Sequence, residues 1–290
     1  MQVLARRRVT AGIGAVTLTL GSGRLLAQGA SGTDQGLLAR LREAKRVRAG
    51  IADQLPFSTV NPDGTVSGVV PTLAETVMKR LGVPAFDVSI ATYGELIPGM
   101  LAGRWDFVAA ALTVTKARCE QIVFSDPVTL DARAIVSLKR ELKDPPTRIA
   151  EFVTKNAVVG VMAGGADFRL MLTVGVPQAN LRQFPNEAAM MDGLIAKRAQ
   201  VVFDSHAALA KIIQQRGLDL AITYPIEDDQ PTFTACGFRK QDTDLYNAFQ
   251  SELAALKSSG EFRSIVEQYG FEAPPTLLQA TAAQACASQQ

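Results

Sequence analysis

Long apolar runs are scarce in this 290-residue sequence. After residue 27 no segment is long and apolar enough to span a bilayer, which takes roughly 20 residues. The apolar run near the N-terminus, residues 9–20, is about half that length, too short for a membrane anchor. It follows three arginines at residues 6–8 and precedes the small-residue sequence LLA at residues 25–27. We therefore expect residues 1–27 to be an export signal of the twin-arginine type, cleaved near Ala27.

The sequence also has no cysteine near that cleavage point. The mature chain would have no excess of positive charge. Without such a cysteine, no lipid anchor is expected on the mature N-terminus. Residues 1–27 hold four arginines and no acidic residue, so the formal net charge of +2 becomes −2 once they are removed. The positive charge belongs to the signal and gives no support for nucleic-acid binding. We expect a periplasmic protein with no nucleic-acid partner.

Cysteines are few and odd in number: Cys119, Cys236 and Cys286. An odd count in an exported protein leaves at least one thiol unpaired. A bridge between Cys119 and Cys236 is compatible with the oxidising periplasm, and two buried free thiols are the simpler interpretation.

Strand-like and helix-like segments alternate along the mature chain, which favours a parallel α/β sheet. The predicted strands are residues 47–52, 86–90, 106–111, 157–162, 201–203, 218–223 and 232–238. The predicted helices are residues 71–81, 93–101, 188–197, 242–258 and 261–269, with another from about residue 167. Removing 27 of the 290 residues leaves 263, enough for two domains with separate cores. The small, polar tail, residues 276–290, is expected to be flexible.

The segment of residues 96–127 carries the clearest chemical signal. A Gly-punctuated helix end, a buried strand and a Thr-rich corner lead there into a helix start that holds Arg118. Free backbone N–H groups and a guanidinium at such a corner would converge on one carboxylate. Nothing in the segment resembles a nucleophile or a metal cage, so we expect binding without covalent chemistry, cofactor or metal.

Several motifs in order resemble the family 3 solute-binding proteins of bacterial ABC importers. They are LAGRWDFVAA at residues 101–110, Arg118 before FSDP, and the block from GFRKQDTDL to QYGF near the C-terminus. The resemblance covers about residues 45–272. It implies a monomer with two α/β lobes, the type II periplasmic-binding-protein fold, joined by two hinge strands that close the lobes over a ligand. Lobe 1 would comprise residues 36–135 and 234–275 and lobe 2 residues 138–230, and the partner would be an inner-membrane ABC permease.

The same resemblance assigns a binding site. Arg118 would clamp the ligand carboxylate, helped by Thr113 or Thr115, and Asp204 would accept the ligand ammonium. Phe57 would form an aromatic wall. These are the contacts that an amino acid zwitterion needs. Alternatives remain at each position: Arg118 could be a surface residue, Asp204 a helix N-cap, and Phe57 part of the core.

Two departures from the family pattern bear on the ligand. Where the family usually has Gly-Thr at the start of a lobe 2 helix, this chain has Gly164-Gly165. The backbone N–H groups of Gly165 and Ala166 remain as anion donors, but one hydroxyl is lost. We therefore expect the ligand to be held in a geometry that departs from the usual one for α-amino acids.

A narrower resemblance is to the ectoine- and hydroxyectoine-binding branch, carried by GVVPTLA at residues 68–74, YGELIPG at residues 93–99 and the pair RC at residues 118–119. Phe57 and Tyr93 match two of that branch's aromatic walls, although Tyr93 could also be core. The third wall falls at Thr113, and the branch's acid falls at Gln54, beside Asp53. We therefore predict a zwitterion other than ectoine.

Two residues are expected to lie outside the binding site, and two other functions are compatible with the sequence. His206 is expected on a helix surface and Trp105 in packing. A periplasmic dehydratase similar to cyclohexadienyl dehydratases could use the same fold, with Glu95, Asp53 or Asp204 as its acid. A protein that presents its ligand to a membrane sensor is also compatible with the sequence.

Overall fold

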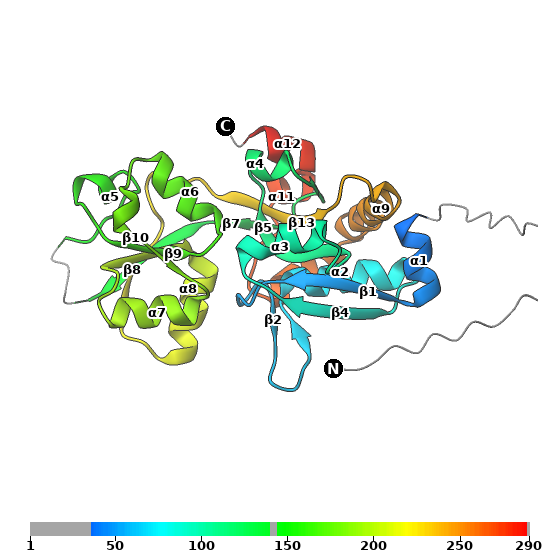
Figure 1. Ribbon diagram of the computed structural model, residues 1–290, viewed down its shortest axis with the longest axis horizontal. Helices are drawn as coiled ribbons and strands as arrows, with labels where there is room; N and C mark the ends of the chain where they lie inside the picture. Colours follow the sequence, from blue (N-terminus) through cyan, green and yellow to red (C-terminus); the bar gives the residue numbers. More distant parts are fainter. Residues whose placement is uncertain (1–35, 140–143, 289–290) are drawn as a thin grey trace, which may run out of the picture. The chain divides into compact units, whose positions relative to one another are not determined.

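The structure is a computed structural model that describes residues 36–139 and 144–288, so the predicted signal, residues 1–27, lies outside it. Residues 35–290 form one compact unit. Within it two β-sheets each carry their own helices and core (Figure 1). None of the helices in the described ranges has the length and apolar character to cross a membrane.

The first sheet has the strand order β4-β1-β5-β13-β6, with β7 also paired to β13. Strand β1 is parallel to β4 and β5, whereas β13 runs antiparallel to β5, β6 and β7. Its strands are β1 (Arg46–Ile51), β4 (Ala85–Ile90), β5 (Phe107–Thr113), β6 (Val123–Phe124), β7 (Thr129–Asp131) and β13 (Thr232–Phe238). A small hairpin, β2 (Thr59–Val60) and β3 (Val66–Ser67), stands apart from it.

The helices that accompany the first sheet include both the N-terminal and the C-terminal described elements. They are α1 (Leu37–Ala44), α2 (Val69–Arg80), α3 (Tyr93–Leu101), α4 (Lys116–Cys119), α9 (Thr243–Ser259), α10 (Glu261–Gln268), α11 (Pro275–Gln279) and α12 (Ala282–Ala287). We call this part lobe 1.

Lobe 2 is built on the second sheet, with the strand order β10-β9-β11-β8-β12. Its strands are β8 (Arg133–Leu138), β9 (Val159–Met162), β10 (Leu181–Phe184), β11 (Val201–Ser205) and β12 (Leu220–Thr223). Its helices are α5 (Glu151–Thr154), α6 (Ala166–Thr173), α7 (Glu187–Ile195) and α8 (His206–Arg216), and a short 3₁₀ turn spans Gln178–Asn180. Helices α5 and α6 cover one face of the sheet and α7 and α8 the other (Figure 1).

Strand β5 shows why the sheets are covered on both faces. Its side chains alternate between two apolar clusters of lobe 1, with Phe107, Ala109 and Ala111 in one and Val108, Ala110 and Leu112 in the other. Successive side chains of a strand point to opposite faces, so an unbroken apolar run fits only a sheet packed on both sides. The buried run FVAAAL therefore requires helices above and below it.

The predicted mainly parallel sheet needs one correction. Strands β8 and β13 run antiparallel to their neighbours in both sheets. These are the strands that follow the two crossings between the lobes, after Asp131 and between Thr223 and Thr232. Two parallel strands need a connection, usually a helix, that returns the chain to the edge of the sheet where the first strand began. The connections between the lobes contain no such helix, so the strand that follows each of them runs antiparallel to its neighbours.

The C-terminal tail also differs from expectation. Residues predicted to be flexible form the end of α11 and all of α12, and Leu277 and Ala285 are fully buried. Only residues 289–290 of the tail lie outside the described part. Small side chains let α12 pack closely on lobe 1. The small, polar composition of the tail, which by itself predicts flexibility, is therefore compatible with a helix packed on the lobe.

The cysteine pairing corrects both interpretations left open by the sequence. Cys119 forms a disulfide with Cys286, across 167 residues of sequence. Cys236 is a free, buried thiol, and burial raises its pKa to about 12. The partner of Cys119 thus lies in the segment that was expected to be flexible.

Candidate functional site

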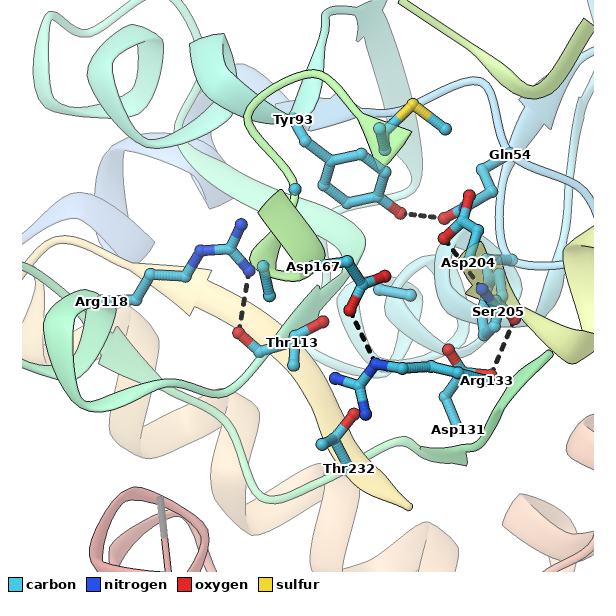
Figure 2. A pocket seen from close by; sticks show the side chains of 15 residues that line it. Gln54, Tyr93, Thr113, Arg118, Asp131, Arg133, Asp167, Asp204, Ser205 and Thr232 are labelled. Carbon is cyan, nitrogen blue, oxygen red and sulfur yellow. Dashed lines mark hydrogen bonds and ion pairs between the residues drawn. The ribbon is translucent and has the colours of Figure 1, made fainter. Parts of the chain in front are cut away.

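A cavity lies between the two lobes where several strands end (Figure 2). Strand β5 contributes Thr113, β9 contributes Met162, and β11 contributes Asp204 and Ser205. The carboxyl ends of parallel strands are the usual position of ligand sites in open α/β sheets. Lobe 1 also supplies Gln54, Phe57, Tyr93, Ala111, Arg118, Asp131 and Thr232, and lobe 2 supplies Arg133, Gly165, Ala166 and Asp167.

Arg118 joins both lobes from helix α4. Its Nη1 donates to the Thr113 carbonyl at 2.9 Å, and its Nη2 donates to the Gly164 carbonyl of lobe 2 at 3.3 Å. Burial lowers the pKa of Arg118, whereas Tyr93 and Asp167 oppose that change. A guanidinium has five N–H donors, so donors remain for a carboxylate in the cavity.

The helix start at Arg118 is less open than expected. The Arg118 N–H donates to the Thr115 carbonyl at 3.1 Å and approaches its Oγ1 at 3.4 Å. Thr115 is therefore the N-cap of α4, and it lines the outer groove rather than the inner cavity. The anion-binding capacity of this corner rests on the guanidinium rather than on a free amide of Arg118.

Gln54 connects the lobes on the opposite side of the cavity. Its Oε1 accepts a hydrogen bond from the Tyr93 hydroxyl, and its Nε2 lies 3.4 Å from Oδ2 of Asp204 (Figure 2). Tyr93 begins α3 and packs against apolar clusters of both lobes. Burial raises the pKa of the Tyr93 hydroxyl, so it stays a neutral donor.

Asp204 is buried at the end of β11, with 5 % of its surface exposed. Its Oδ1 accepts from the Ser205 N–H at 2.8 Å, while Ser205, not Asp204, caps helix α8. Burial raises the pKa of Asp204 well above its usual value, and the nearby carboxylates of Glu187 and Asp167 add to this. A carboxylate held in such surroundings is stabilised by a cation.

Two further acids near Asp204 were not predicted. Asp131, at the end of β7, accepts from the Ser205 hydroxyl at 2.7 Å, and burial raises its pKa to about 7. Burial also raises the pKa of Glu187, at the start of α7, to about 7. In the described part of the chain, Oε1 of Glu187 is the one buried side-chain polar atom without a hydrogen-bond partner. Glu187 is not part of the cavity lining, and its sequence signal is only that of a helix first turn.

A buried network of ion pairs forms part of the cavity wall. Arg133 Nε lies 2.6 Å from Oδ1 of Asp167, and its Nη1 lies 2.9 Å from Oδ1 of Asp229. Burial alone would lower the pKa of Arg133, but these two carboxylates raise it above its usual value. The sequence clue was an arginine directly before the apolar run AIV of β8. Its partners are 34 and 96 residues away, so their pairing could not be foreseen.

The carboxylates of this region outnumber its cations. Arg133 is committed to Asp167 and Asp229. Across residues 36–139 and 144–288, no ion pair joins Asp131, Asp204 or Glu187 to a described basic side chain. The interior on the Asp204 side therefore favours a cationic group, while Arg118 offers the anion contact.

The remaining predicted residues separate into those in the cavity and those outside it. Phe57 lines the cavity, yet its ring also packs on Phe271 at a centroid distance of 5.0 Å, and only 1 % of it is exposed. Phe57 is therefore part of both the cavity wall and the hydrophobic core. Gly165 N–H donates to the Met162 carbonyl at 3.1 Å, so it is not a free anion donor. The amide of Ala166 is the first of α6, where N–H groups lack intrahelical acceptors.

Neither Asp53 nor Glu95 lies in the inner cavity. Asp53 is exposed and accepts from the Thr59 hydroxyl at 2.6 Å. Glu95 forms the capping box of α3 with Thr92. Trp105 is buried in packing, as predicted, and its Nε1 donates to the Leu96 carbonyl at 3.0 Å.

His206 begins helix α8, where a helix position was predicted. Its ring is partly covered, because it stacks on Tyr224 at a centroid distance of 3.7 Å.

The cavity continues into a wider groove on the Thr113 side. The cavity itself measures about 30 Å³ and the groove about 1120 Å³, and both are lined by Tyr93, Thr113, Arg118, Arg133 and Thr232. The inner space is nearly filled by the side chains around it, so a ligand of amino acid size must displace some of them or extend into the groove.

Two sheet-based lobes enclose a polar cavity to which both contribute charged side chains, an arrangement typical of small-ligand sites between domains. Residues 47–272 match the bacterial extracellular solute-binding proteins, family 3, and the chain belongs to that family.

Several proteins of this class are similar to the chain. The chain is 25 % identical over 233 residues to the probable amino-acid ABC transporter periplasmic-binding protein y4tE of Sinorhizobium fredii, covering 78 % of this chain and 77 % of that protein. It is 23 % identical over 221 residues to the histidine-binding periplasmic protein of Escherichia coli, covering 74 % and 83 %. Among solved structures, EhuB in complex with hydroxyectoine is similar, with a TM-score of 0.82 and 32 % identity, covering 86 % and 97 %.

Proposed function

We propose that this protein captures a small zwitterion in the periplasm and delivers it to an inner-membrane ABC permease. The observation that carries the proposal is the placement of Arg118 and Asp204 in one cavity between the lobes. Arg118 binds the ligand carboxylate, and Asp204 accepts the cationic group. The ligand class is amino acids and their cyclic relatives.

The charge balance of the cavity supports a ligand that carries a cation. Burial raises the pKa values of Asp204, Asp131 and Glu187, and none of the three carboxylates forms an ion pair with a basic side chain of the described residues. A cationic group placed among them restores the ionised forms. A purely anionic ligand would face only Arg118 without such a gain.

The opening at Thr113 supports a zwitterion other than ectoine. The resemblance to the ectoine-binding branch puts Thr113 at the position of an aromatic wall, and here it borders both the cavity and the groove. The aromatic surface left in the cavity is that of Phe57 and Tyr93. A ligand that extends past Thr113 into the groove fits this shape better than a compact ring does.

A thermal-shift screen tests the proposal on the mature protein, with amino acids, ectoines and betaines as probes. A ligand that binds only the native state raises the melting temperature by mass action. We expect at least one zwitterion to raise it, with the binding verified by titration calorimetry. If none of these zwitterions raises the melting temperature, the proposal is wrong.

The dehydratase alternative keeps one supporting observation, the raised pKa of the buried Asp204, which suits an acid that gives up a proton. The other two candidate acids, Asp53 and Glu95, lie outside the cavity lining. Incubation with prephenate or arogenate distinguishes the functions. The binding function predicts no phenylpyruvate or phenylalanine, whereas the enzyme would produce one of them.

A further inference from the structure

The C-terminal helix α12 is fastened to lobe 1 at its beginning. The Ala282 N–H donates to Oδ1 of Asp126 at 2.9 Å, and the same oxygen accepts from Nε2 of Gln250 at 3.0 Å. A capping box formed by Thr281 and Gln284 ends the preceding loop. The helix thus starts at a fixed point next to β6.

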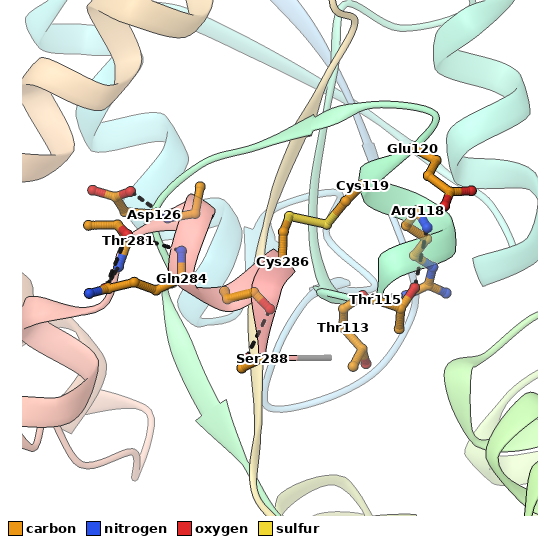
Figure 3. Close-up of a disulfide and its surroundings, with 12 residues drawn as sticks. Thr113, Thr115, Arg118, Cys119, Glu120, Asp126, Thr281, Gln284, Cys286 and Ser288 are labelled. Atoms are coloured by element: carbon orange, nitrogen blue, oxygen red, sulfur yellow. Dashed lines mark hydrogen bonds between the residues drawn. A yellow bond between two sulfur atoms is a disulfide. The ribbon is translucent and has the colours of Figure 1, made fainter. Parts of the chain in front are cut away.

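The middle and end of α12 are also held. Ala285 is fully buried in an apolar cluster that includes Ile122 and Phe124. Cys286 is joined to Cys119 of α4 by the disulfide (Figure 3). Ser288, just beyond α12, lines the groove that continues from the cavity. The helix therefore runs from an anchored start to the edge of the binding cleft.

Helix α4 has little of its own to hold it. It consists of four residues, Lys116–Cys119, and none of them is fully buried, although Arg118 and Cys119 are half-buried. A single helical turn is unstable by itself, because few hydrogen bonds offset the ordering of its backbone. Thr115 caps its start, and the disulfide fixes its last residue, which directly follows Arg118.

We propose that α12 and the Cys119–Cys286 disulfide position Arg118 for the carboxylate of the ligand. The inference rests on the proposed function, in which Arg118 is the carboxylate contact. With α4 held at both ends, the guanidinium keeps its bond to the Thr113 carbonyl and its direction into the cavity. Without the tether, α4 and Arg118 sample other orientations, and ordering them again costs binding free energy.

The first test needs no ligand. Hydrogen exchange is compared between the wild type and Cys286→Ser at the amides of Cys119, Gln121 and Ile122, which bond to Thr115 and Arg118 carbonyls. We expect exchange at these amides to become about tenfold faster, while strand β5 keeps its protection. Cys236→Ala is the matched control, since it removes the buried free cysteine of lobe 1, keeps the Cys119–Cys286 disulfide and should leave α4 exchange unchanged. Equal exchange in Cys286→Ser and the wild type would overturn the proposal.

The second test uses L-arginine and agmatine, which share a guanidinium and differ by the α-carboxylate. A positioning role predicts that Cys286→Ser weakens L-arginine binding by about tenfold and agmatine binding much less. In an Arg118→Ala background the same substitution should have no further effect, because the group being positioned is gone. Equal losses for both probes, or a full additional loss in that background, would show a role in general stability and overturn the proposal.

The two tests also separate this inference from the proposed function. If L-arginine, agmatine and every zwitterion of the screen fail to bind the wild type, the proposed function fails. Hydrogen exchange alone then decides whether α12 and the disulfide order α4. If Arg118→Ala weakens binding and Cys286→Ser changes neither exchange nor affinity, only the positioning role fails.

Discussion

At the scale of single residues, two opposite charges define what the cavity can hold. Arg118 reaches across from α4 and meets lobe 2 at the Gly164 carbonyl, while Asp204 approaches lobe 1 through Gln54. Each charged group thus lies at the junction of the lobes. A ligand that engages both contributes directly to holding the lobes together.

Arg118→Ala should weaken zwitterion binding by roughly 2–5 kcal/mol, the scale seen when one partner of a buried charge pair is removed. The fold should survive, because the side chain faces the cleft. Arg104→Ala is the control, since this exposed arginine of lobe 1 lines neither the cavity nor the groove. Titration calorimetry that gives Arg118→Ala a near wild-type affinity would remove the carboxylate assignment.

Asp204→Asn keeps the size of the side chain and an oxygen for the Ser205 N–H, but removes the charge. We expect a loss of roughly 2–5 kcal/mol for a zwitterion. The N-acetylated form of the same zwitterion lacks the cation and should lose much less. Calorimetry on both compounds measures the difference, and equal losses would count against Asp204 as the cation acceptor.

Thr113→Phe should shift the preference of the protein toward ectoine. An aromatic face at this position adds a cation–π contact worth about 0.5–2 kcal/mol and narrows the opening to the groove. The measurement is a competition titration of ectoine against a panel of amino acids on both proteins. Tight, exclusive ectoine binding by the wild type would contradict the predicted order of ligands.

At the scale of elements, the lobes meet where the start of α3 faces the turn before α6. A Cβ on Gly164 would lie 2.3 Å from the backbone nitrogen of Gly94 in the other lobe. Gly164 also has a φ of +71°, which favours glycine. The absence of a side chain at Gly164 therefore allows the backbones of the lobes to approach each other at the side of the cavity that holds Arg118.

Gly164→Ala should weaken ligand binding by about tenfold or more, since the added methyl group obstructs the contact between lobes. Gly217→Ala is the matched control: it also lies in lobe 2 at positive φ, but a Cβ there meets nothing within 4 Å. Both variants should lose about 1–2 kcal/mol of folding stability from the left-handed backbone. Unchanged affinity in Gly164→Ala would show that this contact is not needed for binding.

The sequence predicted elements well where one local pattern dominated. Helix α3 and strand β13 have the predicted bounds, because periodicity and turn residues mark both ends. The docked α12 was missed because its small residues carry no clear period, and its attachment depends on Asp126 and Cys119, far away in the chain.

The residues of the candidate site also separate into those that the sequence indicated and those that it missed. The resemblance to a family indicated the residues that now line the cavity, such as Arg118, Asp204, Tyr93 and Gln54. Arg133 and Asp131 were missed, because their importance comes from partners that only folding brings together. The ligand roles of the predicted residues remain predictions for the experiments above.

At the scale of the whole molecule, the chain crosses between the lobes twice, after Asp131 and between Thr223 and Thr232. We expect these two connections to act as the hinge about which the lobes rotate. Two of the contacts that join the lobes, Arg118 with Gly164 and Gln54 with Asp204, lie beside the cavity. Closure and ligand capture are therefore expected to be one event.

Small-angle X-ray scattering of the mature protein, with and without the zwitterion that calorimetry shows to bind most tightly, tests this central claim most directly. Hinge closure predicts a smaller radius of gyration at saturating ligand, and little change for Arg118→Ala at the same concentration. An unchanged scattering curve for the wild type, alongside calorimetric binding, would contradict capture by closure of the two lobes.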